Sequence, residues 1–505
     1  MNSAGLPLPA AAGIMRGPMP PIAISKTKLL SYLQCPKRLW LEQYSPELED
    51  EDAFDDAAIE TGRVVGAMAR QVYGHGGGHL VSHNRGLRSA IAETTELLEA
   101  GGKEPIFEAT FDYDGLTVLV DVLERSGDAP RIVEVKSSTS VKDHFLADCA
   151  IQAWTLKALN VPLAGTALAL INNEFEYAGE DDYSELFREI DLTPDLTDLI
   201  DTMPAVVEDV RATLGSLDEP AREIGAHCQS PLPCPFFAYC SPKQGEYPVL
   251  GLGGRKEPLY ELMLAGVSDI RDLREDQLQN ATQQRIWQQT KTGAAYVADE
   301  LKTEITSLAY PRYYLDFETI AFAIPIWAGT RPYQALPFQW SCHIDAGDGQ
   351  IAHEEFLDLS GEPPMRQAAE ALIDRLGADG PIIVYSAYEK RVLNELAARY
   401  PDLAPQLAAL GERLVDLLPL AKQHYYHPEM RGSWSIKAIL PTIDAGIDYS
   451  SLVEVRDGEA AQSAFLEAIR EDSSAERRNA LRDALLAYCR LDTEALVRLV
   501  EFFSR

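Results

Sequence analysis

The stretch LTVLVDVLERSGDAPRIVEVKSS, residues 116–138, contains two runs rich in β-branched and apolar residues on either side of a turn with Gly and Pro. Such runs predict antiparallel strands joined by a short loop. Another run begins at residue 105 and ends at the turn YDG, so residues 105–137 are expected to form a three-stranded meander. Because side chains of a strand alternate between faces, Glu134 and Lys136 are expected on one face.

Asp121, Glu134 and Lys136 are the first group with recognisable chemistry. Two carboxylates can hold a divalent metal ion, and a lysine can orient water or offset charge in the transition state of phosphodiester hydrolysis. The alternative is an ordinary cross-strand ion pair on a solvated face. Taken alone, the three residues favour the ion pair.

The wider arrangement resembles the RecB-like nucleases of the PD-(D/E)xK type. The chain has the motifs of that family in the same order: an aspartate, then E-V-K after a hairpin, then a helix that carries Gln152 in DCAIQAW. The resemblance implies a restriction-endonuclease-like α/β core with a catalytic role for Gln152, and it matches Glu108 in PIFEATF to an additional acidic residue. The family often has a tyrosine four positions after its glutamine, where this chain has Leu156.

Three of the seven cysteines, Cys228, Cys234 and Cys240, lie in the segment HCQSPLPCPFFAYC, residues 227–240. An odd number, too small for a disulfide framework, favours a reducing cytoplasm, where clustered thiols indicate a metal. Some RecB-like nucleases, of the AddB and CRISPR-associated types, are similar in having one cysteine before the core and three after it, which hold an iron-sulfur cluster.

This resemblance makes Cys35, in YLQCPKRLW, the upstream ligand and implies a four-iron cluster, with tetrahedral zinc as the alternative. The cluster is expected to connect the two ends of the domain rather than to perform chemistry. The remaining cysteines are expected to be buried and unligated; they are Cys149, Cys342 and Cys489.

A second group begins at YYLDFETI, residues 313–320, where Asp316 and Glu318 lie two apart on a predicted strand. Near the end of the chain, LLAYCRLDTEAL places Tyr488 and Asp492 one turn apart on a predicted helix. Three acids could bind two metal ions for in-line attack on a phosphodiester, and Tyr488 could orient the water. The alternative is acids scattered over solvated faces.

This pattern resembles the DEDD exonucleases of the tyrosine-bearing type, on an RNase H-like fold. For the middle acid of that family the chain offers Glu389 in PIIVYSAYEKRVL, with Asp416 in RLVDLLPLAKQ as the substitute. Lys437 in GSWSIKAIL resembles a serine-lysine segment of some relatives and is assigned a phosphate contact.

Composition sets limits on this reading. With 505 residues and 46% hydrophobic content the chain is long enough for two or three domains. A net charge of -33 argues against a large phosphate-binding surface, without excluding a metal-dependent nuclease with a narrow basic groove. Part of the excess is local, in the acidic stretch 47–56, which is expected to be a solvated loop.

The predicted organisation is an α/β multidomain protein. It comprises a disordered tail (1–22), a RecB-like domain (23–245), a helical connector with a Gly-rich turn like that of a helix-hairpin-helix (246–305) and an exonuclease domain (306–505). Residues 23–42 are expected to form one helix that carries Cys35 and is capped by Ser25. No apolar run is long enough to span a membrane.

The sequence therefore predicts a nuclease that uses magnesium or manganese at two hydrolytic sites, with nucleic acid, specifically DNA, as partner. One alternative is an RNA-directed or repair exonuclease in which only the C-terminal site works. Another is a non-catalytic nucleic-acid-binding or assembly protein with a structural cluster.

Overall fold

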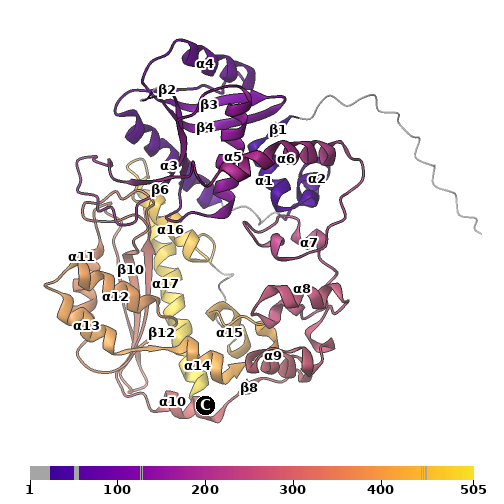
Figure 1. Cartoon of the computed structure of the whole chain (residues 1–505). Helices are drawn as coiled ribbons and strands as arrows, with labels where there is room; N and C mark the ends of the chain where they lie inside the picture. Colours follow the sequence, from indigo (N-terminus) through magenta and orange to yellow (C-terminus); the bar gives the residue numbers. More distant parts are fainter. Residues whose placement is uncertain are drawn as a thin grey trace, which may run out of the picture. The chain divides into compact units, whose positions relative to one another are not determined.

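The computed structural model describes residues 23–50, 56–125, 127, 129–444, 446, 449 and 452–505. The predicted tail 1–22 and part of the acidic stretch 47–56 lie outside these residues. The chain divides into two compact units (Figure 1). Unit 1 consists of residues 1–170, 187–222 and 227–239, and unit 2 consists of residues 171–186, 223–226 and 240–505.

Unit 1 contains a seven-stranded sheet in the order β2-β3-β4-β5-β6-β7, with β1 paired in parallel to β4. Antiparallel pairing of β3 with β4 and of β4 with β5 confirms the predicted meander. The strand β6 pairs in parallel with β5 after the crossover helix α5, and it is buried along its length. The strands are β1 (Ile24–Ser25), β2 (His79–Leu80), β3 (Ile106–Tyr113), β4 (Leu116–Glu124), β5 (Arg131–Lys136), β6 (Gly165–Ile171) and β7 (Phe187–Asp191).

Apolar side chains of the helices α1, α5 and α6 pack against those of β3 and β4 in one core of unit 1. The helices of unit 1 are α1 (Lys26–Gln34), α2 (Pro36–Tyr44), α3 (Asp56–Gly74), α4 (Leu87–Glu99), α5 (Asp143–Ala158) and α6 (Thr197–Gly215). Short 3-10 turns occur at η1 (Pro46–Leu48) and η3 (Ala226–Cys228), and the four-residue helix α7 spans Phe237–Cys240.

The single helix predicted over residues 23–42 is wrong in one respect. Ser25 does cap its start, accepting a hydrogen bond from the Lys28 backbone N–H at 3.2 Å. At Cys35, however, the backbone is extended (φ -163°, ψ 121°), and a second helix begins at Pro36. Proline disfavours helical geometry in the residue before it and is well tolerated at a first helical position, so the break falls at the cysteine.

Unit 2 contains a five-stranded mixed sheet in the order β11-β10-β9-β12-β13. The central strand β9 pairs antiparallel with β10 and parallel with β12. A separate pair is formed by β8 and β14. The strands are β8 (Tyr296–Val297), β9 (Arg312–Ile320), β10 (Leu336–Asp345), β11 (Ile351–Leu357), β12 (Ile382–Val384), β13 (Leu414–Asp416) and β14 (Tyr425–Tyr426).

Helices cover both faces of this sheet. Trp340 on β10 donates its indole N–H to the Ala368 carbonyl of α11 at 3.0 Å, whereas its neighbour Gln339 donates to the Leu485 carbonyl of α17 at 2.8 Å. Because adjacent strand residues point to opposite faces, α11 and α17 lie on opposite sides of the sheet. Figure 1 shows α17 running beside β10.

The helices of unit 2 include those of the predicted connector, whose residues from 246 to 305 cluster with the C-terminal part of the chain. No helix within the described ranges has both the length and the apolar character to cross a membrane. The α-helices are α8 (Lys256–Leu264), α9 (Ala281–Thr292), α10 (Asp299–Thr306), α11 (Met365–Arg375), α12 (Tyr388–Arg399), α13 (Ala404–Glu412), α14 (Leu417–His424), α15 (Ile436–Ile443), α16 (Gly458–Ala468) and α17 (Ala475–Phe503).

Candidate functional site

Asp316 and Glu318 lie on β9 and face the long helix α17. In the pairing of β9 with β10, Asp316 lies opposite Ser341 and Glu318 lies opposite Gln339. Directly opposite residues of an antiparallel pair share a face, and Gln339 reaches the Leu485 carbonyl of α17. The i, i+2 spacing seen in the sequence therefore directs both acids toward the helix that carries Asp492.

Asp492 is 9% exposed and lies one helical turn after Tyr488 on α17. The hydroxyl of Tyr449 donates to Asp492 Oδ1 at 2.5 Å, and a hydrogen bond from Tyr488 also reaches this carboxylate. Tyr449 was not predicted from the sequence, because it precedes α16 in a connecting segment with no periodic pattern. Two tyrosine hydroxyls thus hold one aspartate.

Glu389 and Asp492 line the same cavity of about 540 Å³, together with Asp316 and two lysines, Lys422 and Lys437. Glu389 belongs to the first turn of α12, directly after β12. Since β12 is parallel to its neighbour β9, the chain that leaves its carboxyl end passes close to the second half of β9. Acids from three elements far apart in the sequence thereby reach one cavity.

Asp416, the predicted substitute for Glu389, has another role. It is the last residue of β13, and its side chain caps α14 by accepting the Leu418 backbone N–H at 2.9 Å. It lies close enough to raise the pKa of Glu389 but is not among the residues that line the cavity. Of these two acids, only Glu389 lines the cavity.

Burial raises the pKa values of all four acids of this site. For Asp316, repulsion by Asp492, Glu318 and Glu389 adds to burial and holds the pKa well above its usual range. Burial and Asp492 have the same effect on the pKa of Glu318. Burial raises the pKa of Glu389 to about 7 and that of Asp492 to about 6. Negative charge in this site is therefore poorly compensated by the protein itself.

Lys437 partly offsets that charge, because it lowers the pKa values of Glu318 and Asp492. Its Nζ lies 5.3 Å from the ring centre of Tyr449 and 5.5 Å from that of Tyr488. In the described part of the chain, neither Lys437 nor Lys422 forms an ion pair within 4 Å with any of the four acids. A small cation could bind here without displacing a salt bridge.

Cys489 also reaches this site. Ligand atoms of Asp316, Glu318 and Cys489 all lie within 4.8 Å of one another. The thiol lies 3.7 Å from Asp316 Oδ2, and burial together with Asp316 raises its pKa well above the usual range. The prediction that Cys489 is buried is confirmed, but its neighbours are acids rather than core side chains alone.

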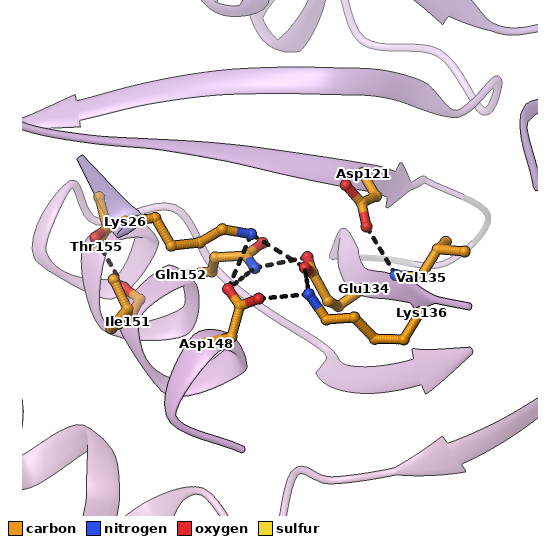
Figure 2. Close-up of polar contacts among 9 residues, drawn as sticks. All are labelled: Lys26, Asp121, Glu134, Val135, Lys136, Asp148, Ile151, Gln152 and Thr155. Carbon is orange, nitrogen blue, oxygen red and sulfur yellow. Dashed lines mark hydrogen bonds and ion pairs between the residues drawn. The ribbon is translucent and has the colours of Figure 1, made fainter. Parts of the chain in front are cut away.

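Unit 1 contains a second acidic group, shown in Figure 2, in which carboxylates are paired with lysines. Lys136 Nζ donates to Glu134 Oε1 and to Asp148 Oδ2, at 2.6 Å each. Lys26 Nζ lies 3.0 Å from Glu134 Oε1 and 2.8 Å from Asp148 Oδ1. Gln152 Nε2 donates to Glu134 Oε2 at 2.7 Å and to Asp148 Oδ1 at 3.1 Å. The predicted Glu134, Lys136 and Gln152 are therefore in direct contact.

Lys26 and Asp148 complete this network, and the sequence reasoning missed both. Although burial acts in the opposite direction on each group, Glu134 and Asp148 hold the pKa of Lys26 well above its usual range, and the two lysines hold that of Asp148 well below. Asp148 lies four residues before Gln152 on α5, so helical spacing could have found it. Lys26 comes from the distant start of α1, and its position gave no such signal.

Asp121 lies beside this network on β4. Its Oδ2 accepts the backbone N–H of Val135, the residue after Glu134 on β5, at 2.8 Å. Burial and then Glu134 raise its pKa to about 7. Glu108, on β3, has a positive φ of 54° and lies 3.7 Å from Arg70. Burial raises the pKa of Glu108, although Arg70 acts to lower it.

Three of the four predicted cysteine ligands, Cys35, Cys228 and Cys234, belong to unit 1. The Cys234 backbone N–H donates to the Cys228 carbonyl at 2.9 Å. Burial raises the pKa of Cys234 to about 11, and both Cys228 and Cys35 contribute to the rise. Gln34, next to Cys35, donates to the carbonyls of His227 and Leu232 at 2.7 Å each, which fixes the break between α1 and α2 to the later cysteine loop.

Cys240 is the last residue of α7, which begins three residues after Cys234. The division between units falls directly before it. None of the seven cysteines, all within the described residues, forms a disulfide. Cys149 and Cys342 are fully buried, as predicted.

Comparisons with known proteins give little beyond this geometry. Residues 313–435 match the family model described as "Domain of unknown function (DUF2779)", a range that includes Asp316, Glu318 and Glu389 but ends before Lys437. No curated protein matches the chain. Among solved structures it is similar to one described as "Crystal structure of SSO0001", at 15% identity with a TM-score of 0.25, over 45% of this chain and 89% of that chain.

Proposed function

We propose that the protein is a divalent-metal-dependent nuclease whose C-terminal centre, of the DEDD exonuclease type on an RNase H-like fold, cleaves phosphodiester bonds of nucleic acid. The observation that carries the proposal is the convergence of four carboxylates from β9, α12 and α17 on one site. Three of them are buried and Asp316 is partly buried, their pKa values are raised, and none forms an ion pair within 4 Å among the described residues.

The donor set fits magnesium or manganese, which prefer carboxylate oxygens. Asp316, Glu318 and Asp492 would hold the ions, and Glu389, which lines the same cavity as Asp316 and Asp492, would be the middle acid. Bound divalent ions would activate a water molecule and offset the charge of the phosphate. Tyr488 would orient the water, and Lys437 would contact a phosphate oxygen. Tyr449 holds Asp492 in position through its hydroxyl.

The cluster in unit 1 supports a second, RecB-like centre, in which Asp121 and Glu134 would hold metal and Lys136 would act on the water. Its Glu134 and Asp148 already pair with two lysines at 2.6 to 3.0 Å. A metal ion bound to Glu134 would compete with Lys26 and Lys136 at Oε1 or with Gln152 at Oε2. This favours the alternative in which the C-terminal centre performs hydrolysis, with DNA or RNA as substrate.

We further propose an iron-sulfur cluster held by Cys35, Cys228, Cys234 and Cys240. Its support is the backbone hydrogen bond from Cys234 to Cys228 and the hydrogen bonds that fix Gln34, next to Cys35, to the cysteine loop. Protein purified without oxygen is expected to be brown and to contain iron and sulfide in similar amounts, and Cys35→Ala should bleach it. If elemental analysis finds about one zinc per chain and no iron, the four cysteines hold zinc rather than an iron-sulfur cluster.

The test of the nuclease proposal is an assay on end-labelled single- and double-stranded DNA and RNA, with magnesium or manganese, for the wild type, Asp316→Asn and Asp121→Asn. We expect hydrolysis that Asp316→Asn abolishes. Hydrolysis that is unchanged in both variants would show that neither proposed centre performs it. No hydrolysis by the anaerobically purified wild type on any substrate would favour the non-catalytic nucleic-acid-binding alternative.

A further inference from the structure

The helix α12 separates the acidic cavity from a larger one of about 750 Å³. Glu389, in the first turn of α12, lines the acidic cavity, whereas its neighbour Lys390 lines the other. An α-helix turns by about 100° per residue, so neighbouring residues of its first turn point to different sides. The two cavities therefore lie on either side of the same turn. Further lining residues of the larger cavity are Arg331, Arg391, Arg399, Glu176, Glu395 and Tyr400.

This second cavity, here termed the cationic cavity, is unusual in a chain with a net charge of -33. Its lining contains four cations, Arg331, Lys390, Arg391 and Arg399, and two carboxylates. Acidic surfaces repel phosphate, whereas a cavity with excess positive charge attracts a polyanion.

The cations of the cavity differ in their availability. Arg399 has a structural role, because it donates to the carbonyls of Ala328, at 3.0 Å, and Gly329. Over the described ranges, neither Arg331 nor Lys390 lies within 4 Å of a carboxylate oxygen. Both side chains, one from the segment before β10 and one from α12, can therefore contact a ligand.

Two other lining residues affect the charge and the contacts available to a ligand. Glu395 offsets part of the charge of Arg331 and Arg391, and its Oε2 is buried without a hydrogen-bond partner among the described residues. Tyr400 also lines the cavity, and an aromatic ring beside cations suits a nucleic-acid base as well as its phosphate.

We propose that the cationic cavity binds the sugar–phosphate backbone of a single-stranded nucleic acid whose end lies in the acidic cavity. The proposal rests on the proposed function, because it names the strand that the acidic site cleaves. The acidic site repels phosphate in the absence of metal, and a neighbouring cationic cavity supplies the attraction that holds the strand. The shared backbone chemistry allows DNA or RNA.

The test measures binding of 5′-fluorescein-labelled 20-nucleotide oligothymidylate and oligouridylate by anisotropy in calcium, across a range of salt concentrations. Lys390→Gln and Arg331→Gln are each expected to weaken binding about 3- to 10-fold, and to reduce the slope of log affinity against log salt by about 0.7 per lost phosphate contact. The matched controls Lys291→Gln on α9 and Arg375→Gln on α11 remove the same charge elsewhere on unit 2 and should leave both quantities unchanged.

Three outcomes would overturn the proposal. Affinity and slope unchanged in both variants would show that the cavity does not contact the strand. Equal losses in the variants and the controls would indicate only a general effect of charge. If thymidine monophosphate displaces the oligonucleotide, and Lys390→Gln changes the concentration that this requires, the cavity binds a mononucleotide rather than a strand.

Hydrolysis of bis(p-nitrophenyl) phosphate by the wild type with manganese tests the acidic site separately, because this small diester carries no strand. If the wild type hydrolyses this diester and Lys390→Gln binds the oligonucleotides as tightly as the wild type, the cationic cavity does not bind the strand but the proposed function stands. Loss of binding in Lys390→Gln without any hydrolysis by the wild type supports the cavity as a strand-binding site and rejects the nuclease.

Discussion

The two acidic clusters contain the same residue types but differ in how their charge is compensated. In unit 1, Glu134 and Asp148 each contact both Lys26 and Lys136 at 3.0 Å or less. In unit 2, the lysines that line the acidic cavity form no ion pair within 4 Å with its acids, as far as the described residues extend. A group of buried carboxylates therefore does not identify a metal site by itself; the position of the nearest cation decides.

The pKa values express the same difference. Burial acts to raise the pKa of Asp148, yet Lys26 and Lys136 hold it well below its usual range. In the other cluster, burial raises the pKa values of Asp316 and Glu318 well above that range, and repulsion by Asp492 adds to the rise. A protein retains such a costly arrangement where another cation can stabilise it, whereas the cluster of unit 1 is stable as an internal salt bridge.

The largest expected effect is on hydrolysis. Asp316→Asn should reduce the metal-dependent cleavage of end-labelled nucleic acid by about 1000-fold or more, because a ligand of the metal ions is lost. Asp402→Asn, which removes an exposed carboxylate paired with Arg366, is the matched control and should leave the rate unchanged. If Asp121→Asn abolished cleavage and Asp316→Asn did not, the catalytic cluster would be the one in unit 1 rather than the one in unit 2.

The next effect concerns the stability of unit 1. Lys26→Met should lower its free energy of unfolding by about 3 kcal/mol, because Glu134 and Asp148 then share one cation at a buried site. Lys157→Met, at an exposed position of α5, is the control. Denaturant unfolding measures both. Magnesium or manganese should restore part of the lost free energy of unfolding only if this cluster can bind metal. If neither ion restores any of it, the cluster of unit 1 does not bind metal.

A smaller effect is expected for the hydroxyls that contact Asp492. Tyr488→Phe should lower the cleavage rate roughly 10- to 1000-fold with little change in the magnesium requirement, because it removes a positioned polar group and no ligand. Hydrogen bonds from Tyr449 and Tyr488 lower the pKa of Asp492, so Tyr449→Phe should shift the acid limb of the pH–rate profile to higher pH. A magnesium requirement shifted by Tyr488→Phe as strongly as by Asp492→Asn would contradict this role.

The smallest effect is on the pH dependence of stability. Asp492 and Glu389 have pKa values of about 6 and about 7 in the folded protein, above the roughly 4 of unfolded chains. Between these pKa values the folded state binds more protons than the unfolded state. The free energy of unfolding of metal-free unit 2 should therefore fall as pH rises from about 4 to about 7. Thermal unfolding measures this, and magnesium at pH 8 should reverse it.

Glu389→Gln should flatten this dependence, whereas the exposed Glu412→Gln should not. A melting temperature of metal-free unit 2 that rises steadily with pH from 4 to 8 would mean that the acids of this cavity are compensated after all, and the contrast between the two clusters would disappear.

Local patterns were sufficient for much of the fold. The alternation of residues 105–137 predicted the meander, and Ser25 predicted the start of α1. The break at Cys35 was missed because apolar periodicity continues through it, although Pro36 marked the position. The strand β13 was also missed, since three residues are too few for a periodic signal.

The sequence by itself determined which side chains each element presents: Asp316 with Glu318 on one strand face, Tyr488 with Asp492 on one helix turn, and Glu134 with Lys136 on another strand. These relations follow from backbone periods of two and 3.6 residues, which act over neighbouring positions. Only the tertiary structure decided that Lys26 compensates Glu134, that Tyr449 holds Asp492, and that Glu389 rather than Asp416 lines the cavity. The physical reason is that electrostatic and hydrogen-bond energies depend on distance in space, which the folded chain sets without regard to separation along the sequence.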